Sequence, residues 1–277
     1  MKVHPVVWTG KIAERLTKPF APKAYGVVLW LAGVAPVLVP LSLLWYLPFP
    51  LSLLSVYPLK ISFSISMLYS LVRRSVPFRD ESRAYVQQMV RRDVTKAEPG
   101  LVRSAAIESL FESAVDGIVS PLFWFLILGL PGALLQRLAN TMDSMVGYKT
   151  PELKEQGWFS ARVDTVLNYV PARLTAFLLY ASAKLMGLDH RISPELRKEA
   201  ASVESPNARV VFLAVSSILR VRLEKKGHYV VGSAFPYPAD GDVLKALKLF
   251  KVSLILFLVL EFIGIAILSY FNPLLAP

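Results

Sequence analysis

Three long apolar runs restrict the fold of this chain more than any other feature. They cover residues 25–47, 50–71 and 249–271. Each is long enough to cross a hydrocarbon core of about 30 Å, which takes roughly 20 helical residues. With 54% hydrophobic residues among 277, the chain is also too apolar for an ordinary soluble domain. The sequence therefore predicts an all-α, polytopic integral membrane protein.

Basic residues flank the first two runs and predict their orientation. By the positive-inside rule both flanks are cytoplasmic, so the two runs form a hairpin that turns at Pro-Phe-Pro (48–50). The net charge of +11 comes without the aromatic-interleaved tracts of nucleic-acid-binding proteins, so no nucleic-acid partner is expected. Anionic lipid headgroups and anionic substrates explain it better. We expect a multi-pass protein of the cytoplasmic membrane.

A fourth apolar segment, residues 118–136, is interrupted by Gly-Leu-Pro-Gly (129–132). A straight crossing would separate the polar residues on its two sides by about 30 Å. Gly and Pro at mid-segment favour a re-entrant or broken hairpin, because non-helical backbone is tolerated at membrane depth when protein surrounds it. The polar residues would then meet in a cytoplasm-facing site. Residues 170–187 carry internal cations and are predicted to be interfacial or packed against protein, and residues 205–223, with three Arg, are predicted to be a poor spanning candidate.

A stripe of acids precedes the broken segment. Glu108, Glu112 and Asp116 are spaced four residues apart, so a helix stacks them on one face, where like charges repel by about 0.2–0.5 kcal/mol per exposed pair. A divalent cation or a cluster of cations would offset this repulsion. The alternative is a solvated acidic face without a role.

Oxygen-bearing side chains and cations alternate after the break. Oxygen ligands hold Mg²⁺ and Arg clamps phosphate oxygens, so this pattern predicts a site for a phosphate and a hard cation. A helix bundle with internally paired ions would use the same residue types. The residues are Asp143, Asp164, Asn140, Asn168, Arg137, Lys149, Arg162 and Arg173. The absence of Cys excludes thiolate sites, and no Gly-rich phosphate loop is present.

The order of these motifs resembles the adenosylcobinamide-phosphate synthase family of cobalamin biosynthesis (CbiB/CobD). The motifs are Glu-x₃-Glu-x₃-Asp-Gly-x₃-Pro-Leu-Phe from Glu108, Asn-Thr-Met-Asp-Ser-Met-Val-Gly-Tyr from Asn140, Ala-Arg-x-Asp-x₃-Asn-x-Val-Pro-Ala-Arg from Ala161, and Ser-Pro-Asn-Ala at 205–208. Weaker matches, among them Arg92 and Tyr229, extend the resemblance collinearly over roughly residues 4–250.

The resemblance implies an integral-membrane ligase that uses ATP and Mg²⁺ to join adenosylcobyric acid to aminopropanol phosphate. It implies one membrane-embedded synthase domain over residues 1–277, with a polar catalytic body at about 76–245. Catalytic roles fall to Glu108, Glu112, Asp116, Asp143 and Asp164, of which Asp116, Asp143 and Asp164 are the expected metal ligands. Phosphate and substrate binding falls to Arg137, Asn140, Lys149, Arg162, Asn168, Arg173 and Asn207. The expected partners are the corrinoid, the amine phosphate and the lipid bilayer, and a homo-oligomer or an association with other corrinoid-pathway membrane enzymes is left open.

Three positions depart from the family pattern. Ser113 stands where the family usually has Asn, Thr165 where it has Asp, and Arg209 where it has Gly. Members also commonly begin with an extra apolar helix before His-Pro, which is either missing here or cut off by a truncated start. The alternative functions are a non-catalytic membrane sensor or signalling relative with the same fold and, with less support, a small transporter.

Overall fold

The computed structural model describes residues 4–271, which fold into two compact units. Each unit collects segments that are distant in the sequence. Unit 1 comprises residues 4–64, 116–168 and 264–271, and unit 2 comprises residues 65–115 and 169–263. The expected single domain over residues 1–277 stays a prediction, and its ends, 1–3 and 272–277, lie outside the described residues.

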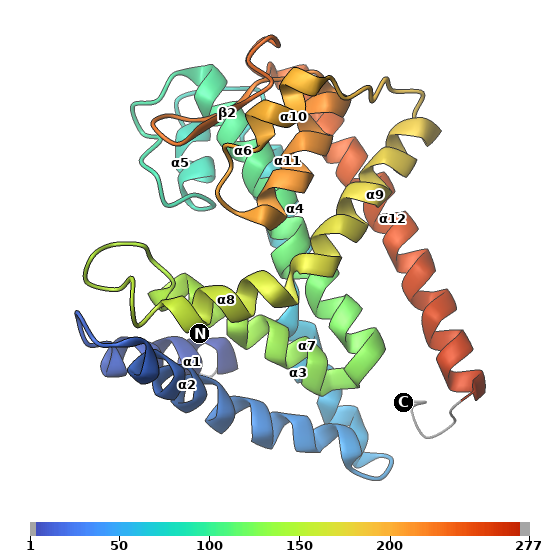
Figure 1. Cartoon of the computed structure of the whole chain (residues 1–277). Coiled ribbons are helices and arrows are strands. Elements are labelled where there is room, and N and C mark those ends of the chain that lie inside the picture. Colours follow the sequence, from blue (N-terminus) through green and yellow to red (C-terminus); the bar gives the residue numbers. More distant parts are fainter. Residues whose placement is uncertain (1–3, 272–277) are drawn as a thin grey trace. The chain divides into compact units, whose positions relative to one another are not determined.

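The secondary structure of unit 1 consists of helices, with no strand among its described residues (Figure 1). Its elements are α1 (Pro5–Leu16), α2 (Lys23–Leu43), η1 (Leu44–Tyr46), η2 (Leu51–Ser55), α3 (Val56–Ser62), η3 (Val115–Val119, a π-helix whose first residue belongs to unit 2), α7 (Ser120–Val146) and α8 (Trp158–Leu167). Its core lies where α2 crosses α7. There Gly33 approaches Met142 so closely that an added Cβ would lie 2.7 Å from the Met142 sulfur.

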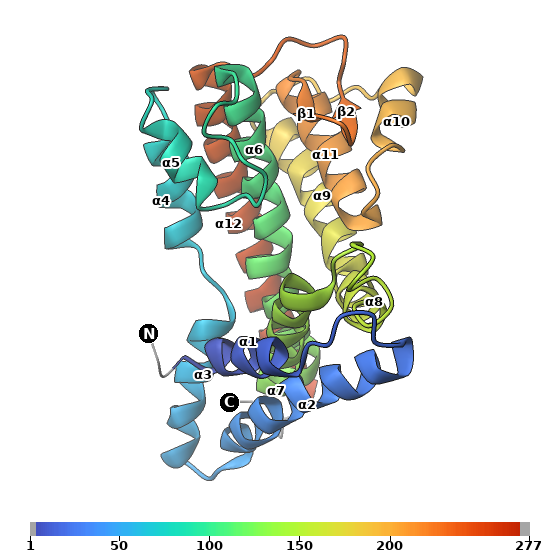
Figure 2. The ribbon, with the colours of Figure 1, turned by 90° about the vertical axis from the view of Figure 1, so that its left-hand side faces the viewer.

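Unit 2 packs further helices and a small hairpin against α6 (Figure 2). Its elements are α4 (Ser66–Arg74), α5 (Ser82–Gln87), α6 (Pro99–Ala114), α9 (Tyr169–Leu185), α10 (Pro194–Ala200), α11 (Pro206–Leu219), β1 (Leu223–Lys225), β2 (Tyr229–Val231) and most of α12 (Asp240–Phe271). The antiparallel hairpin pairs Glu224 with Val230 and was not expected from the sequence. A turn at Gly227, with φ +76°, makes it possible.

Four segments are long and apolar enough to cross a membrane: Lys23–Tyr46, Leu51–Arg74, Pro99–Val146 and Asp240–Phe271. The predicted spans at 25–47, 50–71 and 249–271 match three of them, and the all-α membrane fold is confirmed. The second span is broken, however, because the helix stops at Ser62 and resumes at Ser66, and the Ser64 N–H donates to the Gly117 carbonyl at 3.1 Å. By length and composition, Pro99–Val146 is a fourth candidate, and it contains the apolar segment 118–136 whose break the sequence predicts.

The predicted break in the fourth segment is present at Gly129 inside α7. Its φ of 64° and ψ of −154° are essentially confined to Gly. Trp45 packs against this point, so an added Cβ at Gly129 would lie 3.0 Å from the indole ring. A Cβ at Gly132 would collide with the carbonyl of Trp124, eight residues earlier. In a straight helix residues eight apart are about 12 Å apart, so α7 folds back on itself.

The two shorter apolar segments pack against protein, which is one of the two alternatives predicted for residues 170–187. They form α9 and α11, which pack against each other in unit 2. The Ser-Pro-Asn-Ala motif begins α11: Ser205 is the N-cap, its Oγ accepts the Ala208 N–H at 3.2 Å, and Pro206 occupies the first turn.

Candidate functional site

The fold-back of α7 brings Asp116 and Gln136 into contact. The side-chain amide of Gln136 donates to the backbone carbonyl of Asp116 at 3.1 Å. A straight helix would hold these residues about 30 Å apart, because they are twenty positions apart. The acidic stripe therefore ends beside the polar residues that follow the break. This is the arrangement that the re-entrant or broken reading of the sequence predicts.

A chain of amide hydrogen bonds continues from Gln136 to Asp164. Gln136 donates to Asn168 Oδ1 at 3.1 Å, and Asn168 donates to Asp164 Oδ1 at 3.0 Å. Asn140, one turn after Gln136 on α7, donates to the same carboxylate oxygen at 3.2 Å. Gln136 and Asn168 are buried. We name these residues, with Asp116 and Arg137, the α7–α8 polar cluster.

The electrostatics of the cluster centre on Asp164. Burial raises the pKa of Asp164 above the ordinary range of an Asp, and the hydrogen bonds from Asn140 and Asn168, which favour the charged form, oppose burial only in part. The carboxyl therefore holds a proton at a higher pH than an exposed Asp does. A base with a pKa moved toward neutrality is suited to accept a proton from an ammonium group.

Two buried polar atoms of the cluster have no hydrogen-bond partner within the described residues. They are Oε1 of Gln136, an acceptor, and Nε of Arg137, a donor. Arg137 also interacts electrostatically with Asp116. Buried polar groups are nearly always paired, so an unpaired acceptor and an unpaired donor on consecutive residues indicate that the cluster can bind a polar ligand.

The remaining predicted residues of unit 1 lie toward the end of α7 and beyond it. Asp143 sits over the turn that ends α7, where a Cβ on Gly147 would collide with its Oδ1. Lys149 is exposed in the loop before α8, and Arg162 is exposed on α8. Among the residues that the structure describes, no three His, Cys, Asp or Glu side chains gather in a metal-binding group. The metal roles of Asp116, Asp143 and Asp164 stay predictions.

Unit 2 brings two predicted substrate-binding residues together. Arg173 donates from Nη1 to Asn207 Oδ1 at 3.2 Å and to the Tyr169 carbonyl at 2.8 Å. Its guanidinium also lies 3.3 Å from the centroid of the Tyr169 ring. Asn207 is in the first turn of α11, so the helix N-terminus and the guanidinium present donors on neighbouring elements.

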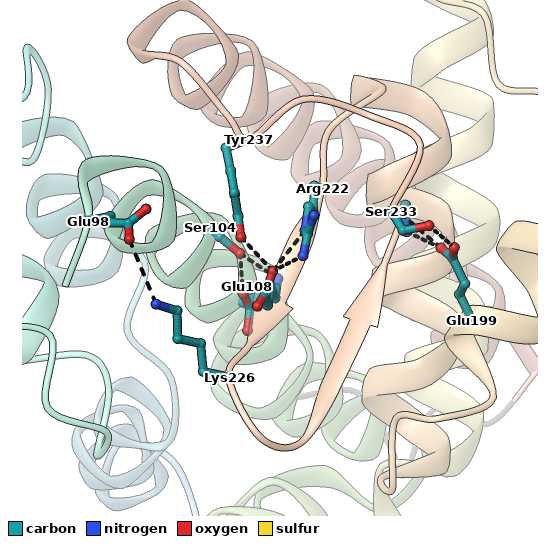
Figure 3. Close-up of polar contacts among 10 residues, drawn as sticks. Glu98, Ser104, Glu108, Glu199, Arg222, Lys226, Ser233 and Tyr237 are labelled. Atoms are coloured by element: carbon teal, nitrogen blue, oxygen red, sulfur yellow. Dashed lines mark hydrogen bonds and ion pairs between the residues drawn. The ribbon is translucent and has the colours of Figure 1, made fainter.

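Glu108 is held inside unit 2 by three side chains. Arg92 donates to both carboxylate oxygens at 3.1 and 3.2 Å, Tyr229 donates to Oε2 at 2.6 Å, and Ser104 donates to Oε1 at 2.5 Å. Ser104 in turn accepts the Glu224 N–H at 2.8 Å, which ties α6 to the hairpin (Figure 3). Burial and the Glu108 charge raise the pKa of Tyr229, so the phenol remains a donor. Glu112 is exposed.

The structure also shows polar residues that the sequence did not single out. Glu224 accepts from Arg222 at 2.7 Å and from Tyr237 at 2.6 Å, and Figure 3 shows Arg222 and Tyr237 pointing toward one another beside the hairpin. Gln136 is the more important omission. The only sequence feature that could have identified Gln136 is that it is a single amide within an apolar run, next to Arg137.

The departures from the family pattern have structural counterparts at two positions. Thr165 donates to the Ala161 carbonyl of its own helix at 2.7 Å. Arg209 donates twice to the Val203 carbonyl, at 3.2 and 3.0 Å, and so braces the segment that leads into α11.

Fold and site together define a multi-pass α-helical membrane protein with a polar cluster at the return of a broken helix. Comparison with known proteins identifies its family. The CobD/Cbib protein family matches residues 1–254. The probable cobalamin biosynthesis protein CobD of Aeropyrum pernix is 43% identical, covering 96% of this chain and 87% of the relative.

Two further relatives have the same description. That of Methanothermobacter thermautotrophicus is 38% identical over 92% of this chain and 89% of its own. That of Pyrococcus abyssi is 38% identical over 98% of this chain and 92% of its own. No solved structure matches the chain. The chain therefore belongs to the CobD/Cbib family, which acts in cobalamin biosynthesis.

Proposed function

We propose that this chain is an adenosylcobinamide-phosphate synthase, an ATP-dependent ligase that joins adenosylcobyric acid to aminopropanol phosphate. Membership of the CobD/Cbib family supports a role in the corrinoid pathway. The observation that best supports the proposed reaction is the fold-back of α7. It joins the Asp116 carbonyl and the side chains of Asn140, Asp164 and Asn168 through Gln136 in one hydrogen-bonded cluster.

The chemistry follows from the inertness of a carboxylate toward amines. Transfer of the γ-phosphoryl group of ATP to the corrinoid carboxylate forms an acyl phosphate and ADP, which turns a carboxylate oxygen into a leaving group. The amine nitrogen then attacks the carbonyl carbon, a proton leaves the nitrogen, and the carbon–oxygen bond to phosphate breaks. The products are the amide and inorganic phosphate.

The α7–α8 polar cluster has groups for the amine half of this reaction. Asp164, whose pKa is raised by burial, accepts the proton from the substrate ammonium. The unpaired Oε1 of Gln136 accepts an N–H of the same group, and the unpaired Nε of Arg137 donates to a phosphate oxygen. Asn140 and Asn168 hold the Asp164 carboxylate in place. In unit 2, Arg173 and Asn207 supply donors for a further phosphate.

The donor set of the cluster fits Mg²⁺. This ion keeps several waters and takes one or two protein carboxylates together with substrate phosphates. Asp116 and Asp143, two of the three predicted ligands, would supply such carboxylates, which leaves Asp164 as the proton acceptor and the orphaned Gln136 Oε1 as the acceptor for the amine. When bound, Mg²⁺ neutralises charge on the phosphate oxygens. The site would face the cytoplasm, where ATP is available.

Turnover by the full chain in lipid nanodiscs tests the proposal. Sustained ADP formation should require ATP, adenosylcobyric acid and aminopropanol phosphate together, because the acyl phosphate step alone releases ADP only once per site, and mass spectrometry should detect the amide. Asp164→Asn should lower kcat/KM by about 100-fold or more, the usual contribution of general-base catalysis. Lys154→Gln, on the loop before α8, is the matched control and should retain wild-type turnover.

The same assay separates the alternatives. Binding of the corrinoid without ADP formation or amide would indicate a non-catalytic relative. Accumulation of an unmodified substrate inside sealed vesicles would indicate a transporter. Either result, or full activity of Asp164→Asn, would refute the proposal.

A further inference from the structure

The turn between α1 and α2 places an aromatic residue where the backbone favours glycine. The Ala21 N–H donates to the Lys18 carbonyl at 3.2 Å, with Pro19 second and Phe20 third in the turn. Phe20 has a φ of 62°. This is the pattern of a type II turn, whose third position normally takes Gly. A bulky residue at positive φ is an outlier, and Phe20 is 72% exposed, so packing against the protein does not explain it.

The turn is held firmly in place. The Phe20 N–H donates to the Glu152 carbonyl at 2.7 Å, and the Lys18 N–H donates to Gln156 Oε1 at 3.3 Å. On the other side, the hydroxyl of Tyr25 donates to the Leu16 carbonyl at 2.5 Å. These contacts fix the strained backbone, so the ring is presented outward from a rigid turn.

The position of the turn along the chain places the Phe20 ring at the end of a candidate membrane span. α2 begins at Lys23, three residues after Phe20, and starts the candidate span Lys23–Tyr46. Phe20 is therefore at the end of a membrane span, where aromatic side chains settle between headgroups and acyl chains. Val28 and Leu31 on α2 are 61% and 52% exposed and continue the apolar surface into the span.

Basic residues surround the aromatic ones. Lys11, Arg15, Lys18 and Lys23 are exposed, and Glu14 is the one acid between residues 11 and 23. Within the described part of the chain, Lys11 and Arg15 form no ion pair. Trp8 is 41% exposed and precedes Arg15 by seven residues, which puts both on the same side of α1. Cations beside exposed aromatic residues are typical of segments that lie in the interface of an anionic membrane.

We propose that α1 and the turn at residues 18–21 form an interfacial anchor that binds anionic lipids. Phe20 enters the boundary between headgroups and acyl chains, and Lys11, Arg15 and Lys18 bind lipid phosphates, while Lys23 pairs with Glu155 at 3.7 Å. Transfer of the Phe20 ring from water into the membrane boundary offsets the free-energy cost of its strained backbone. This property is separate from the proposed reaction and does not depend on it.

Because the chain has no cysteine, single labels test the proposal directly. Phe20→Cys carries a bimane label in full-length protein in nanodiscs, and brominated lipids quench the label where they touch it. Phe262→Cys, 72% exposed on α12 within a span, is the lipid-facing control, and Lys226→Cys in the hairpin turn is the control outside the candidate spans. We expect quenching at residue 20 to approach that at 262. Quenching at the level of residue 226 would overturn the proposal.

A second comparison tests the preference for anionic lipid. At equal mole fractions, brominated phosphatidylglycerol should quench the label at residue 20 at least about two-fold more than brominated phosphatidylcholine, since each cation near an anionic surface contributes on the order of five-fold in affinity. Replacing Lys11, Arg15 and Lys18 by Gln should remove this preference. Quenching of the label at 262 should stay unchanged and report an intact fold. If the two lipids quench the label equally in the protein that keeps Lys11, Arg15 and Lys18, the proposed preference for anionic lipid is overturned.

Discussion

At the residue scale, Asp164 combines a raised pKa with two amide donors, and its effect on stability depends on pH. An unfolded Asp titrates near pH 3.9, whereas burial raises the pKa of Asp164 in the folded protein. The folded state therefore binds this proton more tightly than the unfolded state. The stabilising contribution is complete below about pH 4 and is lost as pH rises through the raised pKa.

Asp164→Asn should remove this pH dependence. We expect the unfolding temperature of the wild type, relative to that of Asp164→Asn, to decrease as pH rises above about 4 in thermal scans of detergent-solubilised protein. Asp189→Asn, at an exposed loop position, is the control and should give a constant difference from wild type. A difference between wild type and Asp164→Asn that rises with pH would contradict the predicted sign.

Glu108 gives a second prediction at this scale, because its carboxylate ties Arg92, Ser104 and Tyr229 together. Glu108→Gln leaves the Arg92 charge without its partner and should destabilise the protein by about 3–5 kcal/mol. Tyr229→Phe removes one hydrogen bond to a charged group and should cost about 1.5–3 kcal/mol. Chemical denaturation would measure both. Equal losses for the two variants would contradict the assignment of the larger role to the ion pair.

The sequence indicated which residues are polar site candidates better than it indicated the hydrogen-bond partners of those residues. Spacing predicted Glu108 and Asp116 as polar site residues, and the alternation of oxygen-bearing side chains and cations after the break predicted Asp164. The sequence could not predict that Gln136 would link Asp116 to Asn168, because that contact depends on the angle at which α7 returns. Nor could it separate Glu108, which is saturated with donors in unit 2, from Glu112, which is exposed one helical turn later.

At the element scale, the return of α7 depends on Gly129. Any Cβ there is strained at φ 64° and ψ −154°, and it also meets the Trp45 ring at 3.0 Å. Gly129→Ala should therefore destabilise the protein by about 1–3 kcal/mol, the usual cost of such backbone strain. Because the fold-back places Gln136 beside Asp116, turnover should fall on the order of 100-fold.

The matched control for this element is Gly117→Ala. A Cβ at Gly117 meets nothing within 4 Å, and Gly117 lies in the neighbouring π-helix. It should be tolerated in both thermal unfolding and turnover. Equal effects of the two alanines would mean that the conformation of Gly129 does not shape the site.

The sequence predicted elements where local chemistry is strong and missed them where tertiary contacts decide. Gly-Leu-Pro-Gly indicated the break in α7. The interruption of the second span at residues 63–65 has no comparable signal, because no Gly or Pro lies there and the bond between Ser64 and Gly117 joins distant segments. The β1–β2 hairpin is too short to stand out from a helical background.

At the scale of the whole molecule, the fold-back determines which residues share a side of the membrane. Gly117 and Met145 flank the broken segment within unit 1, while Phe49, 80% exposed, is at the turn between the first two spans. Because the Asp116 carbonyl contacts Gln136, we predict that the first two face the same compartment. The basic flank at Lys11, Arg15, Lys18 and Lys23 predicts that this compartment is the cytoplasm, which leaves Phe49 on the opposite face.

Single cysteines in this cysteine-free chain turn that topology into an experiment. An impermeant maleimide should label Phe49→Cys in intact cells, and should label Gly117→Cys and Met145→Cys only in inverted vesicles. The reason is that a broken helix returns to its starting side, whereas a straight one of this length crosses. Labelling of residues 117 and 145 from different sides would refute the return of α7. Labelling of both residues in intact cells would agree with the return of α7 but would show the opposite orientation. The site would then lie away from cytoplasmic ATP.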